Sequence, residues 1–274
     1  MTKIQLVADL LASEYLGGAE MVDDNIATYL GSRVIKSDIL CYVDPSVHYI
    51  LSNALNIKPE IRQQLINTKN YSIFEHDFKI HKSREPHYFK DYLFPVNERI
   101  NLDLFENAKN VFVQSKDHLE CYTQNTKDVN INFCNLSTSV WSKEELDLLE
   151  SLVPSSYKTY KFAISDNPYP LKGRAQSEQF CKQAGIDYDL IPRAPKKQYY
   201  EMLSGYPALV SFPIRKESYC RLVVEARCLG MNVITARNYG AVIEPWFSKV
   251  GKELIDFLRV ESIANVKKIK ELCT

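Results

Sequence analysis

Short apolar stretches alternate with amphipathic stretches along most of this chain of 274 residues. The apolar stretches are rich in β-branched and aromatic residues and are bounded by turn-forming or charged residues, a pattern typical of β-strands. Strands are therefore predicted at residues 3–8, 38–43, 71–76, 110–114, 161–165, 188–191, 208–212 and 232–235. Because strands that alternate with helices at this spacing pair in parallel under a cover of helices, the expected fold class is α/β.

The amphipathic stretches between these strands predict helices, at residues 19–30, 115–124, 175–184, 196–203 and 222–229. Ser115 is a suitable N-cap for the second of them, and Gly185 ends the third. These helix signals place each amphipathic stretch between two predicted strands, as a parallel sheet requires.

A polar stretch that contains Pro and Ser, residues 152–159, separates the two halves and is taken as the linker. The sequence therefore predicts two Rossmann-like parallel-sheet domains, residues 1–155 on the acceptor side and 156–274 on the donor side, facing a cleft. Ligands of open parallel sheets bind at the carboxyl ends of the strands. The loops that follow the predicted strands are thus where binding residues are expected.

The overall composition excludes several classes of protein. The 34 basic and 34 acidic residues balance, so no whole-protein field attracts nucleic acid. The chain opens without the apolar region of a signal peptide, and no stretch reaches the ~18 apolar residues of a membrane span.

The seven cysteines form no CxxC pair, which predicts free thiols in a cytoplasm. The five histidines do not lie at ligand spacing from the cysteines, so no zinc site is expected. Frequent Lys, Asn, Ile and Tyr suggest an AT-rich genome, so the host cytoplasm is expected if a phage encodes the chain.

The segment ESYCRLVVEARCLGMNVITARNYGAV, residues 217–242, carries the strongest chemical signal. Glu217 stands where a helix begins, and Glu225 lies about 12 Å further along that helix. A helix entrance offers unpaired N–H groups and suits an anion such as a diphosphate. Carboxylates at this separation cannot share a proton, but they can accept from hydroxyls at opposite ends of one elongated ligand. Spacing alone favours a simpler alternative, two solvated acids on a surface helix.

This segment resembles the E-x7-E segment of GT-B glycosyltransferases of the retaining family 4 type. The resemblance is carried by ESYCRLVVEA at residues 217–226 and LGMNVI at residues 229–234. It continues upstream through residues 199–203 and 208–213, and downstream to residues 239–241, where the family has a Gly-Gly loop. It implies a GT-B fold and a nucleotide-sugar donor.

The resemblance also implies roles for individual residues. Glu217 would face the donor sugar and Glu225 would bind the nucleotide ribose. The loop amides that would lie against the donor are those of Ser218, Tyr219, Cys220 and Arg221. The family has a glycine where this chain has Cys220 and a hydrophobic residue where it has Arg221, and an arginine there could reach a phosphate.

Lys172 and Gly173 follow the first predicted strand of the second half, where family members carry a Lys-Gly pair. By resemblance Lys172 would meet the donor diphosphate, where a cation stabilises charge that develops on the leaving group. The alternative is an ordinary turn before a helix. The family arginine five residues earlier is replaced by Asn167, and the nearest substitutes are Arg174 and Arg193.

The first half carries fainter similarity to the same family. Gly17 and Gly18 open a Gly-Gly-Ala-Glu loop after the first strand, and glycines there let backbone approach a phosphate or sugar. His76 ends a predicted strand at a place where family members have a histidine near the donor sugar and acceptor. A packed histidine with satisfied hydrogen bonds is the alternative.

Other motifs point to other classes and are set aside. Asp187-Tyr188-Asp189 is a DxD triplet, the metal motif of the other large glycosyltransferase fold, but it lies inside the second domain and is interpreted as structural. The G-x-G-x-x-G of a dinucleotide-binding dehydrogenase and the G-x-S-x-G of a serine hydrolase are absent. No metal and no cofactor are expected, apart from the sugar nucleotide as donor substrate.

The sequence thus predicts a metal-independent, retaining hexosyl- or pentosyltransferase that moves a sugar from a nucleotide-diphosphate donor, a UDP-sugar first, to a hydroxyl. The acceptor is expected to be a glycan, or a hydroxymethylated DNA base if a phage encodes the chain. Residues 81–90, HKSREPHYFK, could meet phosphates and stack on bases, although a mobile surface loop is the alternative. The alternative function is a catalytically silent GT-B module that binds a nucleotide or glycan as a structural or regulatory partner.

Overall fold

The computed structural model describes residues 3–15 and 17–274. The chain forms two compact units, one of Met1–Val140 with Glu261–Thr274 and one of Trp141–Val260. The predicted boundary at residue 155 lies inside the second unit, and so does the predicted linker. The physical reason is that Trp141, Leu146 and Leu149 are buried in the hydrophobic core of the second unit, which binds the segment before residue 155 to that unit.

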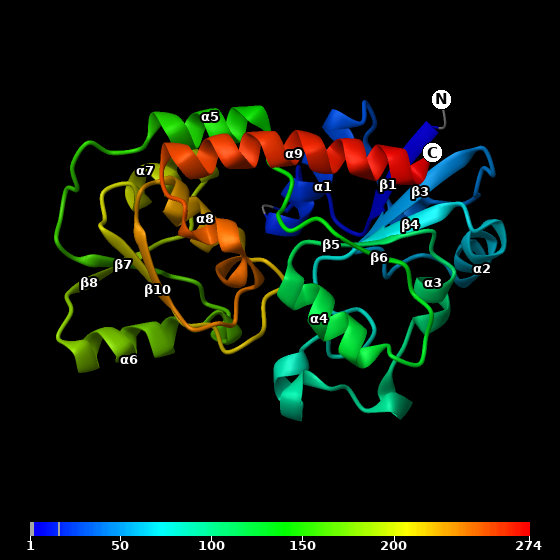
Figure 1. Ribbon diagram of the computed structural model, residues 1–274, viewed down its shortest axis with the longest axis horizontal. Coiled ribbons are helices and arrows are strands. Elements are labelled where there is room, and N and C mark those ends of the chain that lie inside the picture. Colours follow the sequence, from blue (N-terminus) through cyan, green and yellow to red (C-terminus); the bar gives the residue numbers. More distant parts are fainter. Residues whose placement is uncertain (1–2, 16) are drawn as a thin grey trace. The chain divides into compact units, whose positions relative to one another are not determined.

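The first unit is built on a parallel sheet of six strands in the order β2-β1-β3-β4-β5-β6 (Figure 1). Its strands are β1 (Lys3–Ala8), β2 (Val34–Lys36), β3 (Val47–Ser52), β4 (Tyr71–Phe74), β5 (Val111–Val113) and β6 (Phe133–Asn135). Its helices are α1 (Gly18–Tyr29), α2 (Pro59–Thr68), α3 (Leu102–Glu106), α4 (Lys116–Asn125) and the end of α9 (Lys252–Cys273). Ser115 caps α4 as predicted, because its side chain accepts from the backbone N–H of His118.

The predicted strand at residues 38–43 is wrong, and the strand β3 was not predicted. Ser37–Ile39 forms a 3-10 turn instead. Ile39 and Tyr42 are 65% and 62% exposed, so this stretch does not bury its apolar side chains as a strand of a covered parallel sheet does. All six residues of β3 are buried, as expected for a central strand of a parallel sheet.

The second unit is built on a parallel sheet of four strands in the order β10-β9-β7-β8 (Figure 1). The strands β7 (Phe162–Ser165), β8 (Tyr188–Ile191), β9 (Ala208–Ser211) and β10 (Asn232–Thr235) all lie where strands were predicted. The helices are α5 (Lys143–Ser151), α6 (Arg174–Ala184), α7 (Lys196–Leu203), α8 (Arg221–Cys228) and the start of α9. Gly185 ends α6 with a left-handed φ of 65°, which glycine adopts without steric cost.

Over residues 3–15 and 17–274, no helix is both long enough and apolar enough to cross a membrane. Within the same residues, no group of three or more His, Cys, Asp or Glu side chains is placed to hold a metal ion.

Candidate functional site

The carboxyl edge of the second sheet brings Lys172 and Glu217 together. Lys172 Nζ lies 2.7 Å from Glu217 Oε1, and Arg215 Nε lies 3.6 Å from the same oxygen. The Glu217 N–H donates to the Asn238 carbonyl at 2.8 Å, and the Glu217 carbonyl accepts from the Gly240 N–H at 3.0 Å. The loop after β9 is thereby tied to the loop after β10, which fixes the backbone that carries the carboxylate.

Lys172 keeps its charge in this environment. Burial opposes the charged form, but the carboxylate of Glu217 outweighs that effect and raises the pKa of Lys172 above its usual value. The Lys172 side chain is 36% exposed and that of Glu217 is 14% exposed, so a ligand can reach both. The pair therefore offers a permanent cation next to a carboxylate that can accept from hydroxyls.

Gly173 explains why a Lys-Gly pair stands at this place. Its φ is 75°, and a Cβ on it would lie only 1.7 Å from the Phe212 carbonyl oxygen. The Ile214 N–H donates to the Leu171 carbonyl at 3.0 Å, which holds the two loops together. Only glycine permits this close approach, and the approach brings Lys172 beside Glu217.

Glu225 lies on α8 and takes part in a buried cluster of charges. Its Oε1 is 3.7 Å from Arg221 Nε, and burial raises the pKa of Glu225 despite the nearby arginine. Lys196, Arg221 and the hydroxyl of Tyr200 all donate to Oε1 of Glu145, a residue of α5. Burial opposes the charge on Glu145, but Arg221 and Lys196 lower its pKa to about 2. Sequence motifs did not single out Glu145, Lys196 or Tyr200 as site residues.

Arg221 lies in this cluster, and its side chain is therefore engaged away from the loop that was predicted to meet the donor. The guanidinium lies over the Trp141 ring, 3.7 Å from the ring centroid, and it is paired with Glu145. A contact from Arg221 to a phosphate would have to compete with that buried ion pair. The predicted role of the Arg221 backbone at the start of α8 is separate from this, because the helix begins at that residue.

The residues before α8 are mostly buried. Tyr219 packs against Trp246 with ring centroids 6.1 Å apart, and the side chain of Ser218 is also buried. Cys220 has a φ of 73° in the region that favours glycine, which matches the glycine that the resemblance places there. Burial raises the pKa of the Cys220 thiol to about 12, so the thiol stays protonated. The chain thus keeps the backbone shape of a glycine at this position while using another residue.

Of the two substitute arginines, Arg193 takes the place next to Asn167. Its Nη2 lies 3.4 Å from Asn167 Oδ1, at the carboxyl ends of the neighbouring strands β7 and β8. Arg193 is exposed and forms no ion pair with any residue in the described parts of the chain. Arg174 is instead paired with Asp166 and Glu178.

His76, in the first unit, is held by hydrogen bonds on both ring nitrogens. Nε2 lies 2.9 Å from Asp23 Oδ1, and Nδ1 lies 3.1 Å from Gln114 Nε2. The Ser52 hydroxyl donates to Asp23 at 2.7 Å, which orients the carboxylate. Ser52 and Gln114 were missed, although each stands at or just after the carboxyl end of a strand, and a correct prediction of β3 would have pointed to Ser52.

The Glu20 side chain of α1 lies against the backbone of Gly17, the residue before this helix. A Cβ on Gly17 would lie 2.0 Å from Glu20 Oε2, so glycine is what lets this carboxyl group lie against the backbone. Gly18 is the first residue of α1. Burial is the main reason that the pKa of Glu20 is raised. The approach of a phosphate or sugar to Gly17 and Gly18 stays a prediction, since the group that lies against Gly17 here is the Glu20 carboxyl.

Two further sequence features are placed by the structure. Asp187 and Asp189 flank Tyr188 at the amino end of β8, and Asp189 pairs with Lys161 at 2.8 Å and accepts from Tyr206 at 3.1 Å. This supports the structural interpretation of the DxD triplet. In the stretch of residues 81–90, His81 is buried and stacks on Phe94 with centroids 4.6 Å apart, so the stretch is anchored in part.

No family model matches this chain, and no curated protein matches it either. Solved structures do. An α,α-trehalose-phosphate synthase (UDP-forming) from Burkholderia vietnamiensis is 10% identical, with a TM-score of 0.59 over 100% of this chain and 93% of that one. HepE from Anabaena, solved in complex with UDP and glucose, is 11% identical, with a TM-score of 0.53 over 100% and 92% of the two chains.

A sucrose-phosphate synthase from Thermosynechococcus elongatus is 12% identical, with a TM-score of 0.52 over 99% of this chain and 98% of that one. At such low identity the likeness concerns the fold, and it extends over both parallel sheets described above. The expected class is therefore confirmed: the chain has the GT-B fold, with two Rossmann-like parallel-sheet units.

Proposed function

We propose that this chain is a glycosyltransferase that moves a sugar from a nucleotide-diphosphate sugar, a UDP-sugar first, to a hydroxyl. The observation that supports it most is the ion pair of Lys172 and Glu217 at the carboxyl edge of the second sheet, 2.7 Å apart and open to ligand. The similar structures agree with this choice of donor, since HepE was solved with UDP and glucose and with UDP-glucose.

The proposed reaction assigns one task to each group. Lys172 meets the diphosphate, Glu217 accepts from hydroxyls of the sugar, Glu225 binds the ribose, and Arg193 adds a second cation beside Asn167. The bond from the sugar C1 to the diphosphate oxygen breaks, and a bond from C1 to the acceptor oxygen forms. The proton of the acceptor hydroxyl ends on the released nucleoside diphosphate.

We further propose that the reaction retains configuration and needs no metal. Retention rests on the resemblance of residues 217–226 to retaining enzymes. Independence from metal rests on Lys172 and Arg215, which can supply the positive charge that stabilises a leaving diphosphate. A glycan is the proposed acceptor. A hydroxymethylated DNA base is the alternative for a phage enzyme, and the neutral net charge weighs against it.

A silent GT-B module is the second candidate, and one observation favours it. Glu225 is buried, and its neighbour Arg221 is paired with Glu145, so the proposed ribose contact is partly engaged within the protein. Such a module would bind a nucleotide or glycan as a structural or regulatory partner without transferring sugar.

The deciding experiment is a thermal-shift panel of UDP, GDP, ADP and CMP, with and without EDTA, on the wild type and Glu225→Ala. A ligand that binds only the folded state raises the melting temperature. We expect one nucleoside diphosphate to raise it whether or not EDTA is present, and Glu225→Ala to abolish the shift. Release of that diphosphate from its sugar conjugate then separates an enzyme from a silent module. No shift with any nucleotide would contradict the donor site.

A further inference from the structure

The second unit has a groove of about 390 Å³ at the amino end of β10. Arg227 lines it from the last turn of α8, Asn232 from the first position of β10, and Phe247 from the segment after the Gly240 loop. Lys172 and Glu217 lie at the carboxyl edge of the same sheet, so the groove is distinct from the proposed donor site. Its volume is within the range of small-molecule sites.

Arg227 is held in the groove by backbone carbonyls. Its Nη2 donates to the Ser248 carbonyl at 2.8 Å, and its Nη1 donates to the Met231 carbonyl at 3.4 Å. Within residues 3–15 and 17–274, no Asp or Glu forms an ion pair with Arg227, and its buried Nε finds no hydrogen-bond acceptor. The fold therefore fixes the guanidinium but leaves its charge uncompensated.

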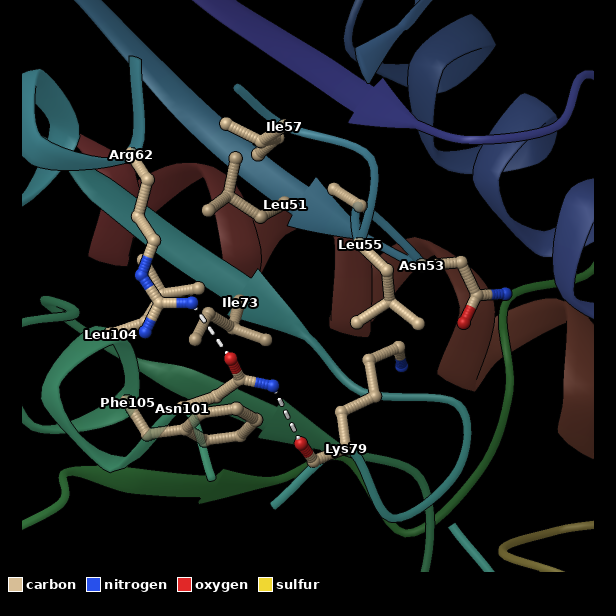
Figure 2. Close-up of a pocket in the computed structure, with 11 residues that line it drawn as sticks. Leu51, Asn53, Leu55, Ile57, Arg62, Ile73, Lys79, Asn101, Leu104 and Phe105 are labelled. Carbon is tan, nitrogen blue, oxygen red and sulfur yellow. Dashed lines mark hydrogen bonds between the residues drawn. The ribbon is translucent and has the colours of Figure 1, made fainter. Parts of the chain in front are cut away.

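The arginine beside the cavity of the first unit is different. Arg62 Nη1 donates to Asn101 Oδ1 at 2.7 Å (Figure 2), and Arg62 Nη2 is paired with Asp103. That cavity measures about 50 Å³, which is room for roughly three to five water molecules. Its arginine is compensated and its space is small, whereas the groove at Arg227 has an uncompensated charge and room for a ligand.

The two arginines of α8 also differ in their electrostatic environment. Burial lowers the pKa of Arg227. Burial opposes the charge on Arg221 too, but Glu145 and Glu225 outweigh that effect and raise the pKa of Arg221. A negative group bound in the groove would stabilise the charge of Arg227 as Glu145 stabilises that of Arg221.

The groove also has an apolar wall beside this charge. Val233, Val242 and Phe247 line it and are half-buried. The guanidinium lies over the Phe247 ring, 5.8 Å from the ring centroid, so the cation and the apolar surface adjoin. Asn232 and Ser248 in the lining are exposed, which leaves the groove open to solvent. A ligand that suits both parts is an anion joined to an apolar body.

Glu244 limits the charge of that anion. It belongs to the lining and is buried, with 6% of its surface exposed. A carboxyl group this near opposes a negative ligand, and the opposition grows with the charge of the ligand. A carboxylate with a single negative charge therefore fits better than a phosphate monoester, which carries nearly two at neutral pH.

We propose that this groove binds a small carboxylic acid with an apolar body. Each Nη of Arg227 carries two N–H groups, and the carboxylate accepts from those that the backbone carbonyls do not use. The apolar body lies on Val233, Val242 and Phe247. Because the groove takes part in no step of the proposed transfer, this inference goes beyond the proposed function and does not depend on it.

The test is a methyl-NMR titration of the whole Val-labelled chain at pH 7, without any nucleotide, using benzoate, benzamide and phenyl phosphate as probes. We expect benzoate to shift the methyl signals of Val233 and Val242 saturably. Benzamide has the same ring without the charge, so it should bind at least about tenfold more weakly, the affinity equivalent of a hydrogen bond to a charged group. Phenyl phosphate should also bind more weakly than benzoate. Unsaturable benzoate shifts, or tighter binding of either other probe, would overturn the proposal.

Variants locate the binding in the groove. Arg227→Gln should abolish the saturable benzoate shifts, while Arg237→Gln should keep them, because it removes the same charge from an exposed position beyond the other end of β10. Asn232→Trp should cover the groove from its exposed rim and also abolish binding, since the start of a strand accepts an aromatic residue. It serves as the test if Arg227→Gln loses the dispersed methyl signals of a folded chain. Benzoate binding of wild-type strength in folded Arg227→Gln or in Asn232→Trp would contradict the site.

Discussion

Cys220 has a backbone φ that favours glycine, although the glycine expected at this position of the E-x7-E segment is replaced by cysteine. The φ of 73° costs free energy in any residue with a Cβ. We expect Cys220→Gly to raise the free energy of unfolding by about 1 kcal/mol, measured by urea denaturation. Cys228→Gly is the control, because it lies in the helical part of α8 and should be destabilising. Equal losses in both variants would contradict the strain at Cys220.

Lys172 carries the second prediction at this scale. If its ammonium stabilises the leaving diphosphate, Lys172→Met should lower kcat roughly 100-fold or more, because an electrostatic contact made mainly in the transition state is lost. Lys172→Arg should recover part of that rate. Lys182→Met, which removes an exposed lysine of α6, should leave steady-state kinetics unchanged. A change confined to KM in Lys172→Met would assign Lys172 to ground-state binding instead.

At the scale of elements, the ion pair of Glu145 and Arg221 joins α5 to α8. The folded state holds the pKa of Glu145 at about 2, below the usual value of 4.5. Its contribution to stability is therefore full above about pH 4.5, and it is lost as the pH falls towards 2. Glu145→Gln should lower the free energy of unfolding at pH 7. It should also make that free energy depend less on pH between the usual pKa of 4.5 and the folded-state pKa of about 2, as measured by denaturation at several pH values.

The neighbouring residue provides the control for this pH dependence. Glu144 lies on the same helix and is exposed, and Glu144→Gln should follow the wild-type profile. A steep wild-type profile that persists in Glu145→Gln would mean that other carboxylates govern acid unfolding. It would also mean that the contact between α5 and α8 depends mainly on the packing of Arg221 on Trp141.

The elements that sequence could predict are those whose local pattern and surroundings agree. All four strands of the second unit were predicted, since each is a short apolar run between turn residues. The strand β3 was missed because polar residues interrupt its apolar pattern. His48 is one of them, and it is tolerated in the core because its ring nitrogens meet Asn70 and Ser72, each at 3.0 Å. Partners that lie far along the chain make such a residue acceptable, and sequence periodicity does not report them.

The residues of the candidate site also fall into two groups, those that a sequence motif identified and those that only the structure identifies. Gly173 and the φ of Cys220 give geometric reasons for positions that the motif had marked. Glu145 and Asp23 were not marked, because their importance comes from Arg221 and His76, which contact them from distant parts of the sequence. Motifs therefore identified residues with a local backbone requirement, and the structure adds the partners that orient them.

At the scale of the whole molecule, residues 261–274 belong to the first unit although the whole second unit precedes them in the sequence. Val266, Ile269 and Cys273 are buried there with Ile4 and Ile26. Ile269→Ala should therefore cost about 2–5 kcal/mol of unfolding free energy. Ile263→Ala is the control, because that side chain on the same helix is 61% exposed and its truncation should change stability little. Equal effects of the two substitutions would contradict the packing of this helix on the first unit.

This interrupted arrangement has a consequence for synthesis. The second unit is one continuous segment, Trp141–Val260, and a ribosome delivers all of it before residues 261–274 emerge. The first unit, most of which is translated before the second, lacks part of its core until residues 261–274 have been made. Domains generally fold in the order in which they are made, but here the earlier one has to wait for residues 261–274. The nascent chain would expose the apolar surface around Ile4 and Ile26 throughout that delay, and it is then that a chaperone has most to cover.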